Sequence, residues 1–186
     1  MEGIEIGVLV NNVGISGGGI NHFHENEIQD LLDLITVNIT AATALCHGLI
    51  PPMLNRGRGA VINIGSVLGH FQGAYCQYLA PYCASKHYIR ALTEALAEEY
   101  KDTSLVFQEV HPGLVKTSIT EGLPSTPMMP SAFQCVSWSL ASLGWTLQTC
   151  GYWAHYIILP FYTTLPVFMD FRKAYQSVNI QKNKTE

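Results

Sequence analysis

Two residues with complementary chemistry stand four positions apart in the stretch APYCASKHYIRAL, residues 80–92. The phenol of Tyr82 ordinarily has a pKa of about 10, roughly three units too high for easy proton transfer at neutral pH. A nearby ammonium group stabilises the phenolate and lowers that pKa. On a helix, Lys86 would lie one turn from Tyr82 on the same face. Such a pair also occurs as two solvated side chains on an ordinary helix. Other residues must therefore distinguish a catalytic pair from a solvated one.

The apolar pattern predicts the elements that would position this pair. Three short apolar runs predict strands buried on both faces: residues 6–12, 59–66 and 104–113. Apolar residues at three- and four-residue steps predict helices over 26–50 and 79–100, and Pro51-Pro52 is expected to end the first helix. Strands alternating with helices predict an α/β fold, a Rossmann-type doubly wound parallel sheet.

Polar residues follow each predicted strand, at the edge where parallel sheets bind ligands. They are Asn11-Asn12, Gly65-Ser66 and His111-Pro112-Gly113. A carbonyl that accepts a hydride develops negative charge on its oxygen. Tyr82 could protonate that oxygen, and Ser66 could hold it by a hydrogen bond, as an oxyanion hole does. The arrangement predicts reduction of a carbonyl compound.

Composition narrows the function classes. The 186 residues amount to one domain with a net charge of −4, which gives no reason to expect nucleic acid as a partner. The five cysteines form no CxxC pair and no metal-binding spacing, which favours reduced thiols. His22, His24, His70 and His111 have no i, i+4 arrangement. We interpret them as loop or site-edge residues and expect no metal site.

The charge distribution divides the chain. Residues 122–169 contain no Asp, Glu, Lys or Arg, and residues 172–186 carry four basic residues against Glu186. An uncharged aromatic stretch before a basic tail favours contact with a membrane surface. A buried subdomain or a homodimer interface is the alternative. We therefore expect a catalytic part (1–121), a membrane-associating segment (122–171), which the family resemblance described next also implies to be a substrate lid, and a basic tail (172–186).

Several motifs occur together and in order: NNVG (11–14), NIGS (63–66), YCASK (82–86) and PGLVKT (112–117). With Asn38 between the first two, they resemble the short-chain dehydrogenase/reductase family over about residues 4–120. The looser likeness through GYWAHY (151–156) resembles the membrane-bound branch of 17β-hydroxysteroid dehydrogenases and very-long-chain 3-oxoacyl-CoA reductases. This resemblance implies hydride transfer between NADP(H) and a ketone or secondary alcohol on a long apolar substrate, a 3-oxoacyl-CoA or a 17-ketosteroid.

The resemblance also implies a role for each matching residue. Tyr82 matches the proton donor, Lys86 the residue that lowers its pKa and bonds the nicotinamide ribose, and Ser66 the residue that orients the carbonyl. Asn38 matches a helix residue whose main chain holds a water linked to the lysine, although local hydrogen bonding that kinks a helix is the simpler interpretation. The expected cofactor-binding residues are Tyr82 and Lys86 themselves, Asn11, Asn12, Val13 and Gly14 beside the adenine side, and Pro112, Gly113, Val115 and Thr117 against the nicotinamide.

Two departures from the family pattern stand out. The sequence begins at what resembles the family's fourth strand, so we expect it to lack the first strands and the Gly-rich TGxxxGxG turn that cradles the pyrophosphate. The gap between Ser66 and Tyr82 is a few residues longer than usual, which predicts an insertion over the site at 69–79. A catalytically incompetent form that acts only by association is therefore an alternative. A nucleotide-sugar epimerase shares the Y-x-x-x-K pattern, but PGLVKT and the apolar C-terminus disfavour it.

The last residues, KNKTE, place Lys184 third and Lys182 fifth from the end. This spacing resembles the K-x-K-x-x retrieval signal of resident membrane proteins, an address read by a receptor. It predicts residence on the endoplasmic reticulum membrane with a cytosolic C-terminus. A frayed basic tail is the alternative.

Overall fold

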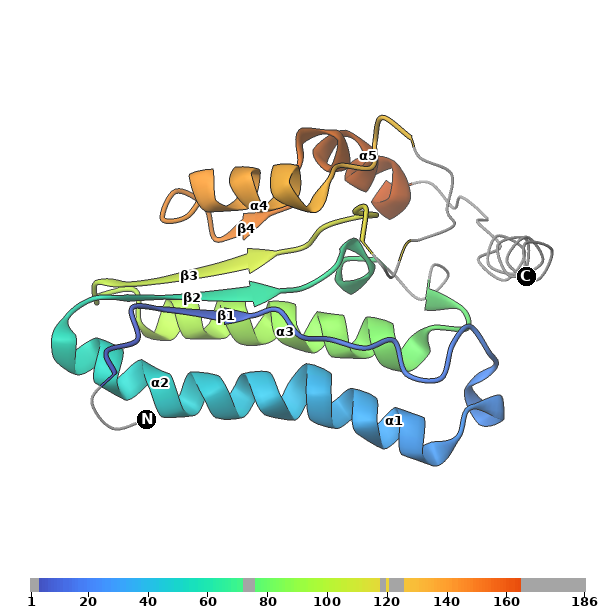
Figure 1. Cartoon of the computed structure of the whole chain (residues 1–186), viewed down its shortest axis with the longest axis horizontal. Coiled ribbons are helices and arrows are strands. Elements are labelled where there is room, and N and C mark those ends of the chain that lie inside the picture. The colour runs from blue at the N-terminus through green and yellow to red at the C-terminus, as the bar shows by residue number, and fades with distance from the viewer. Residues whose placement is uncertain (1–3, 72–75, 118–119, 121–125, 165–186) are drawn as a thin grey trace.

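A four-stranded, fully parallel sheet organises the chain, in the order β1-β2-β3-β4 (Figure 1). The structure, a computed structural model, describes residues 4–71, 76–117, 120 and 126–164. The strands are β1 (Val8–Asn11), β2 (Gly59–Ile64), β3 (Leu105–Val110) and β4 (Gln148–Thr149). The three predicted strands are present and shorter than expected. The two-residue β4 was not predicted.

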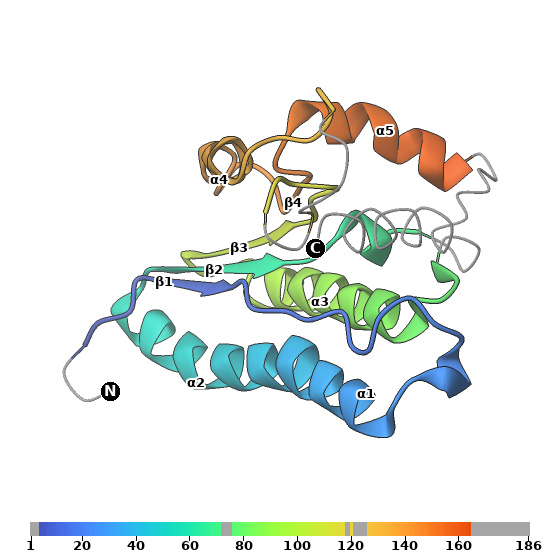
Figure 2. The same cartoon turned by 45° about the vertical axis from the view of Figure 1, so that its right-hand side comes forward.

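Helices cover both faces of the sheet, which confirms the Rossmann-type prediction. In Figures 1 and 2, α1, α2 and α3 lie on one side, and α4 and α5 lie on the other. The helices are α1 (Ile28–Ile35), α2 (Ala41–Arg56), α3 (Ala80–Glu99), α4 (Ala132–Ala141) and α5 (Trp153–Thr164). A π-helical turn (Thr36–Thr40) joins α1 to α2, and short 3₁₀ turns span Phe23–Glu25 and Val67–Gly69.

The prediction that Pro51-Pro52 ends the first helix is wrong, because α2 continues to Arg56. Both proline rings are exposed, while Ile50 and Met53 on either side of them are buried. Burial of these two side chains against the sheet offsets the helix hydrogen bonds that proline cannot donate. Gly57 ends the helix instead, with φ of 73°, a left-handed conformation that glycine adopts at little cost.

The prediction that strands are buried on both faces is right for β2 and wrong for β1. Ala60, Val61 and Ile62 of β2 are all buried. In β1, Leu9 packs into the core beside α2, whereas Val8 and Val10 are half exposed. The reason is that α4 and α5 lie over β3 and β4 (Figure 1), and β1 is the edge strand of the described sheet.

The segment Ile28–Arg56 is the one described helix long and apolar enough to cross a membrane by length and composition. It carries a buried face at helical spacing: Leu31, Leu34, Asn38, Ala42, Cys46, Ile50 and Met53. Several of these pack against the sheet in the main core cluster with Leu9, Val61 and Phe107. One face of the segment therefore packs in the core, while Ile28, Leu32, Ile35 and Leu45 on its other faces are exposed.

The uncharged segment 122–169 contains α4, β4 and α5, none of which its sequence predicted. The basic tail 172–186, with Lys182 and Lys184, lies outside the described residues. Residues 72–75 of the expected insertion also lie outside them. The division into 1–121, 122–171 and 172–186 therefore stays a prediction.

Candidate active site

The residues predicted to do chemistry come from the carboxyl end of β2 and the first turns of α3. Ser66 follows β2 and caps the 3₁₀ turn Val67–Gly69, where its Oγ accepts a hydrogen bond from the Leu68 N–H at 3.2 Å. Tyr82 and Lys86 lie on one face of α3, with Lys86 Nζ 5.7 Å from the centroid of the Tyr82 ring. Parallel topology therefore brings three residues distant in sequence to one edge of the sheet.

Lys86 is buried, and its ammonium is anchored to the end of β2. Its Nζ donates a hydrogen bond to the Ile64 carbonyl at 2.9 Å. Burial lowers the pKa of Lys86 to about 8, and the charge of Glu109 opposes that shift. Lys86 is therefore mostly protonated at neutral pH, although desolvation makes its charged form costly.

The pKa of Tyr82 does not follow the sequence prediction. Burial raises it, a hydrogen bond with Ser66 acts in the opposite direction, and Lys86 is not among the groups that lower it. The physical reason is geometric: Lys86 Nζ lies over the Tyr82 ring and is bonded to Ile64. Ser66 is the residue that tunes the phenol in this arrangement.

Asn38 lies in the π-helical turn, and its buried side chain links three segments. Its Oδ1 accepts a hydrogen bond from the Ile15 N–H at 2.8 Å, and its Nδ2 donates to the Ile15 carbonyl at 2.9 Å and to Ser85 Oγ at 3.0 Å. Ser85 Oγ in turn donates to the Tyr82 carbonyl at 2.7 Å. Ser85 was missed as a site residue, although it lies within the YCASK motif.

The predicted cofactor loop after β1 lies partly at the site. A Cβ on Gly14 would lie 3.4 Å from Lys86 Nζ and 3.3 Å from Asn38 Oδ1, so the backbone passes close to both. Asn11 Nδ2 donates to Asn63 Oδ1 at 2.7 Å, while Asn11 Oδ1 is buried without a partner among the described residues. Asn12 and Val13 are exposed at the surface.

The predicted nicotinamide segment begins beside Ser66 and then leaves the sheet. The Pro112 carbonyl accepts a hydrogen bond from the Val67 N–H at 3.1 Å. The Gly113 N–H donates to His155 Nδ1 at 3.2 Å, which ties this segment to α5. The Val115 carbonyl accepts from Thr120 Oγ1, and Thr117 is exposed in the same turn. Pro112 and Gly113 therefore lie at the strand ends, and Thr117 lies further out.

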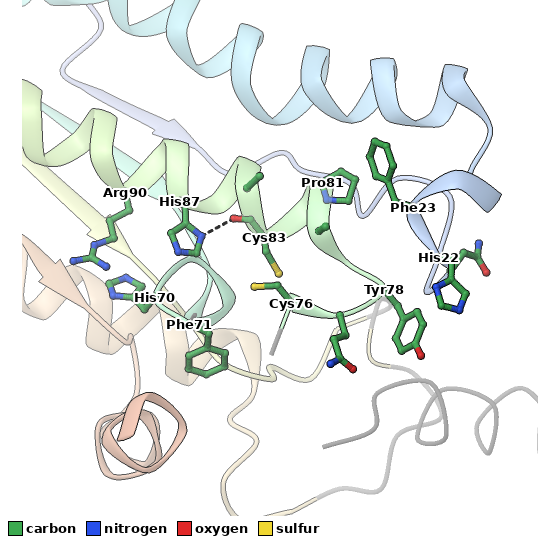
Figure 3. Close-up of a pocket in the computed structure, with 14 residues that line it drawn as sticks. His22, Phe23, His70, Phe71, Cys76, Tyr78, Pro81, Cys83, His87 and Arg90 are labelled. Atoms are coloured by element: carbon green, nitrogen blue, oxygen red, sulfur yellow. Dashed lines mark hydrogen bonds between the residues drawn. The ribbon is translucent and has the colours of Figure 1, made fainter. Parts of the chain in front are cut away.

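A pocket of about 1100 Å³ opens next to this set without including it (Figure 3). Its walls come from the loop before α3 and from the neighbouring face of α3, including His70, Phe71, Cys76, Tyr78, Cys83 and His87. Tyr82, Ser66 and Lys86 are not among its lining residues. The described part of the expected insertion, 69–71 and 76–79, thus forms a wall of this pocket.

Sequence reasoning also missed a buried carboxylate beneath the site. Glu109 of β3 is fully buried, and its Oε2 lies 3.1 Å from His70 Nε2 and 3.2 Å from His111 Nδ1. Burial raises the pKa of Glu109, but hydrogen bonds from the two histidines more than offset that effect and lower it overall. The available signal was a charged residue inside an otherwise apolar strand pattern.

Comparison with known proteins identifies the family. Residues 3–127 match the short chain dehydrogenase family, so the chain belongs to that family, as its motifs indicated. It is 31% identical to human 17-beta-hydroxysteroid dehydrogenase type 3, covering 95% of this chain and 56% of that protein. It is 30% identical to mouse very-long-chain 3-oxoacyl-CoA reductase, covering 99% of this chain and 61% of that protein.

A third relative is named as inactive. Human inactive hydroxysteroid dehydrogenase-like protein 1 is 32% identical, covering 89% of this chain and 50% of that protein. The chain thus spans 50–61% of the length of these relatives.

Solved structures support the fold. A structure of 7beta-hydroxysteroid dehydrogenase superposes with a TM-score of 0.75 at 22% identity, covering 86% of this chain and 62% of that one. A short-chain dehydrogenase from Sphingobium yanoikuyae, solved in complex with NADPH, gives a TM-score of 0.66 at 30% identity, covering 76% and 55%. The arrangement of strands and helices described above is therefore that of this family.

We predict that Lys86→Met stabilises the chain near neutral pH. Below pH 8 Lys86 is charged in both folded and unfolded chains, so its desolvation opposes folding in full. Between pH 8 and 10.5 the folded chain loses the proton first, and this cost disappears. Urea unfolding should therefore show a gain of up to about 3 kcal/mol at pH 7, shrinking towards pH 10.5.

Lys101→Met is the matched control, because the Lys101 side chain is 59% exposed. It should change stability little at any pH. A Lys86→Met variant that is less stable than the wild type at pH 7, by an amount independent of pH, would contradict the assigned desolvation.

Proposed function

We propose that this chain carries the catalytic residues of an NADP(H)-dependent oxidoreductase that interconverts a ketone and a secondary alcohol on a long apolar substrate. The observation that carries the proposal is the convergence of Ser66, Tyr82 and Lys86 at one strand edge, in a chain that belongs to the short-chain dehydrogenase family. Relatives named as a steroid dehydrogenase and a 3-oxoacyl-CoA reductase favour this substrate class.

The residues present fit a nicotinamide cofactor. Gly14 leaves room beside Lys86 Nζ that a Cβ would fill at 3.4 Å, and Asn11 Oδ1 is an acceptor left free among the described residues. Lys86, Gly14 and the Pro112-Gly113 segment would hold the cofactor, which supplies or accepts the hydride when bound. The Sphingobium relative solved with NADPH supports the choice of NADP(H).

The side chains then have separate tasks at the substrate oxygen. Tyr82 donates a proton to the oxygen during reduction and takes it back during oxidation. Ser66 donates a hydrogen bond that holds the same oxygen and disfavours other orientations of the carbonyl. Lys86 would bind the nicotinamide ribose, and the Ser66 hydroxyl, rather than Lys86, is the group that lowers the pKa of the Tyr82 phenol.

The uncharged segment 122–169 favours an apolar substrate and contact with a membrane surface. Its described part exposes large side chains on α4 and α5 and on the connection between them: Phe133, Val136, Trp138, Leu140, Trp145, Trp153, Tyr156 and Ile157. Exposed apolar patches of this kind mark binding surfaces for lipids or other molecules. We propose that this segment contacts the membrane and guides a lipid-like substrate to Tyr82.

A second candidate function is association without catalysis. Two observations favour it: one relative at 32% identity is named inactive, and β1 presents an open edge with half-exposed Val8 and Val10. The chain would then act only by binding another protein. Failure to detect NADPH-dependent turnover of any ketone would favour this candidate.

Tyr82→Phe tests the assigned proton donor. The substitution keeps the ring and its packing but removes the transferable proton, so we expect turnover to fall by about 10²–10⁴-fold. NADPH affinity should change little, because the phenyl ring remains in place. Steady-state rates of NADPH-dependent ketone reduction by the wild type and the variant measure the effect.

Tyr88→Phe is a suitable control, because Tyr88 lies on the same helix and its hydroxyl bonds Thr43 Oγ1 at 2.8 Å. It should retain full activity. Retention of more than about a tenth of the activity by Tyr82→Phe would exclude Tyr82 as the donor.

Substrate length tests the apolar class. Because each buried methylene contributes about 0.8 kcal/mol, kcat/KM should rise with acyl length across a series of 3-oxoacyl-CoA substrates. The same assay with 17-ketosteroids distinguishes the two substrates under consideration. Equal turnover of short and long chains would argue against a long apolar site.

The location on the endoplasmic reticulum membrane, with a cytosolic C-terminus, stays a proposal that rests on Lys182 and Lys184. An internally tagged protein with both lysines changed to Ser should move to later secretory compartments. If the variant keeps the reticular distribution of the wild type, Lys182 and Lys184 do not act as a retrieval signal. A glycan on Asn183, within the triplet Asn183-Lys184-Thr185, would place the tail in the lumen.

A further inference from the structure

Three side chains with metal-binding groups meet below the candidate active site, and the proposed reaction uses none of them. They are His70, which follows the 3₁₀ turn after β2, Glu109 of β3, and His111, just beyond β3. One ligand atom from each lies within 4.8 Å of the other two. The His70 and His111 rings contact each other with 4.0 Å between centroids and a tilt of 39°, and both imidazoles lie against the same carboxylate.

The distances are close to those of a coordination shell. Tetrahedral zinc with bonds of about 2.0–2.1 Å has ligand atoms about 3.3 Å apart. Glu109 Oε2 lies 3.1 Å from His70 Nε2 and 3.2 Å from His111 Nδ1, so two of the three edges already have this length. A small movement of the imidazoles would admit an ion between the three atoms.

Neighbouring residues contact both His111 and Glu109 and restrict how they can move. His111 Nε2, the ring nitrogen that faces away from Glu109, lies 3.2 Å from Cys150 Sγ. Metal binding through Nδ1 requires His111 to give up the Nδ1 proton that it shares with Glu109 and to carry its proton on Nε2, where Cys150 Sγ can accept it. Glu109 itself is held against the backbone, because a Cβ on Gly65 would lie 2.2 Å from its Oε1.

Access to the cluster comes from the pocket. Glu109 and His111 are buried, whereas His70 keeps 9% of its side chain exposed and lines the pocket of Figure 3. An ion could enter past His70 and keep one coordination position open on that side. Two histidines, one carboxylate and an open position are a known zinc ligand set.

We propose that His70, Glu109 and His111 form a binding site for one divalent transition metal ion of the zinc type. The bound ion would cross-link the loop after β2 to the end of β3. Because Ser66 begins that loop and Pro112 follows His111, the ion would fix the strand ends on which the candidate active site is built. This proposal is independent of the redox function proposed above.

Metal titration of the purified chain tests the site without any assay of activity. After treatment with a chelator, we expect one Zn²⁺ per chain by calorimetry, with a dissociation constant of about 1 μM or tighter. Saturating Zn²⁺ should raise Tm by about 5–10 °C, as expected for a ligand that binds only the folded state. Co²⁺ should give the visible absorption of a tetrahedral complex.

Matched variants separate this site from other histidines. His70→Ala and Glu109→Gln should each weaken Zn²⁺ binding by about 10-fold or more and abolish the Tm rise. The control is the double variant His22→Ala with His24→Ala. The rings of these two histidines stack with their centroids 5.8 Å apart, but both residues are exposed and lie away from the cluster. Circular dichroism at the titration temperature checks that each variant is folded.

Two outcomes would overturn the proposal. One is the absence of saturable Zn²⁺ binding to the folded wild-type chain, which would leave Glu109 as a buried carboxylate that is hydrogen-bonded to two histidines. The other is wild-type affinity in folded His70→Ala, or loss of binding in the His22 and His24 control, which would place the ion elsewhere.

Discussion

The amide of Asn38 is the interaction on which the geometry of the site depends. A buried amide must find partners for its polar atoms, since each unsatisfied group costs about 1–3 kcal/mol. Asn38 does so with both main-chain groups of Ile15 and with Ser85 on α3. These bonds hold the loop after β1 against the first turns of α3 and bring Gly14 close to Lys86. The π-helical turn that carries Asn38 is the local irregularity that permits this, and such turns are frequent at functional sites.

Lys86 shows how function and stability oppose each other in this site. Its ammonium lies in a buried position where desolvation lowers the pKa, and within the described part of the chain it donates one hydrogen bond, to the Ile64 carbonyl. A hydrophobic side chain would fit the same place at lower cost. Under the proposed function the charged group binds the cofactor, which gives this cost a functional reason. The negative charge of Glu109 favours the charged form of Lys86 and so reduces this cost, although the sequence did not predict a role for Glu109.

The sequence predicted the parts of the fold in which periodicity and motifs agree. The runs of β1, β2 and β3, the helices around Asn38 and Tyr82, and the convergence of Ser66, Tyr82 and Lys86 all followed from local pattern. Properties set by distant neighbours did not. The exposure of Val8 and Val10 depends on which helices cover β1, and the pKa of Tyr82 depends on where Lys86 Nζ points. His70, Glu109 and His111 looked unrelated because only the strand register and the loop after β2 bring them together. The neutral segment 122–169 offered no charge pattern from which α4 or α5 could be delimited.

The parallel pairing of every strand also bears on how the chain reaches its fold. Val8 lies opposite Ala60 and Gly59 opposite Leu105, so each ladder joins residues separated by a whole helix. None of the pairs formed by the described strands can form as a local hairpin, and chain entropy must be lost before any of these ladders is complete. Contacts of this kind make folding slow, and partly folded chains meanwhile expose apolar strands such as β1. Helix 28–56 and helix α3 can form early because their contacts are local, and they then present the surfaces on which the strands assemble. We therefore expect the newly synthesised chain to fold more efficiently when chaperones assist it. Refolding from denaturant should give the highest yield at low protein concentration and moderate temperature.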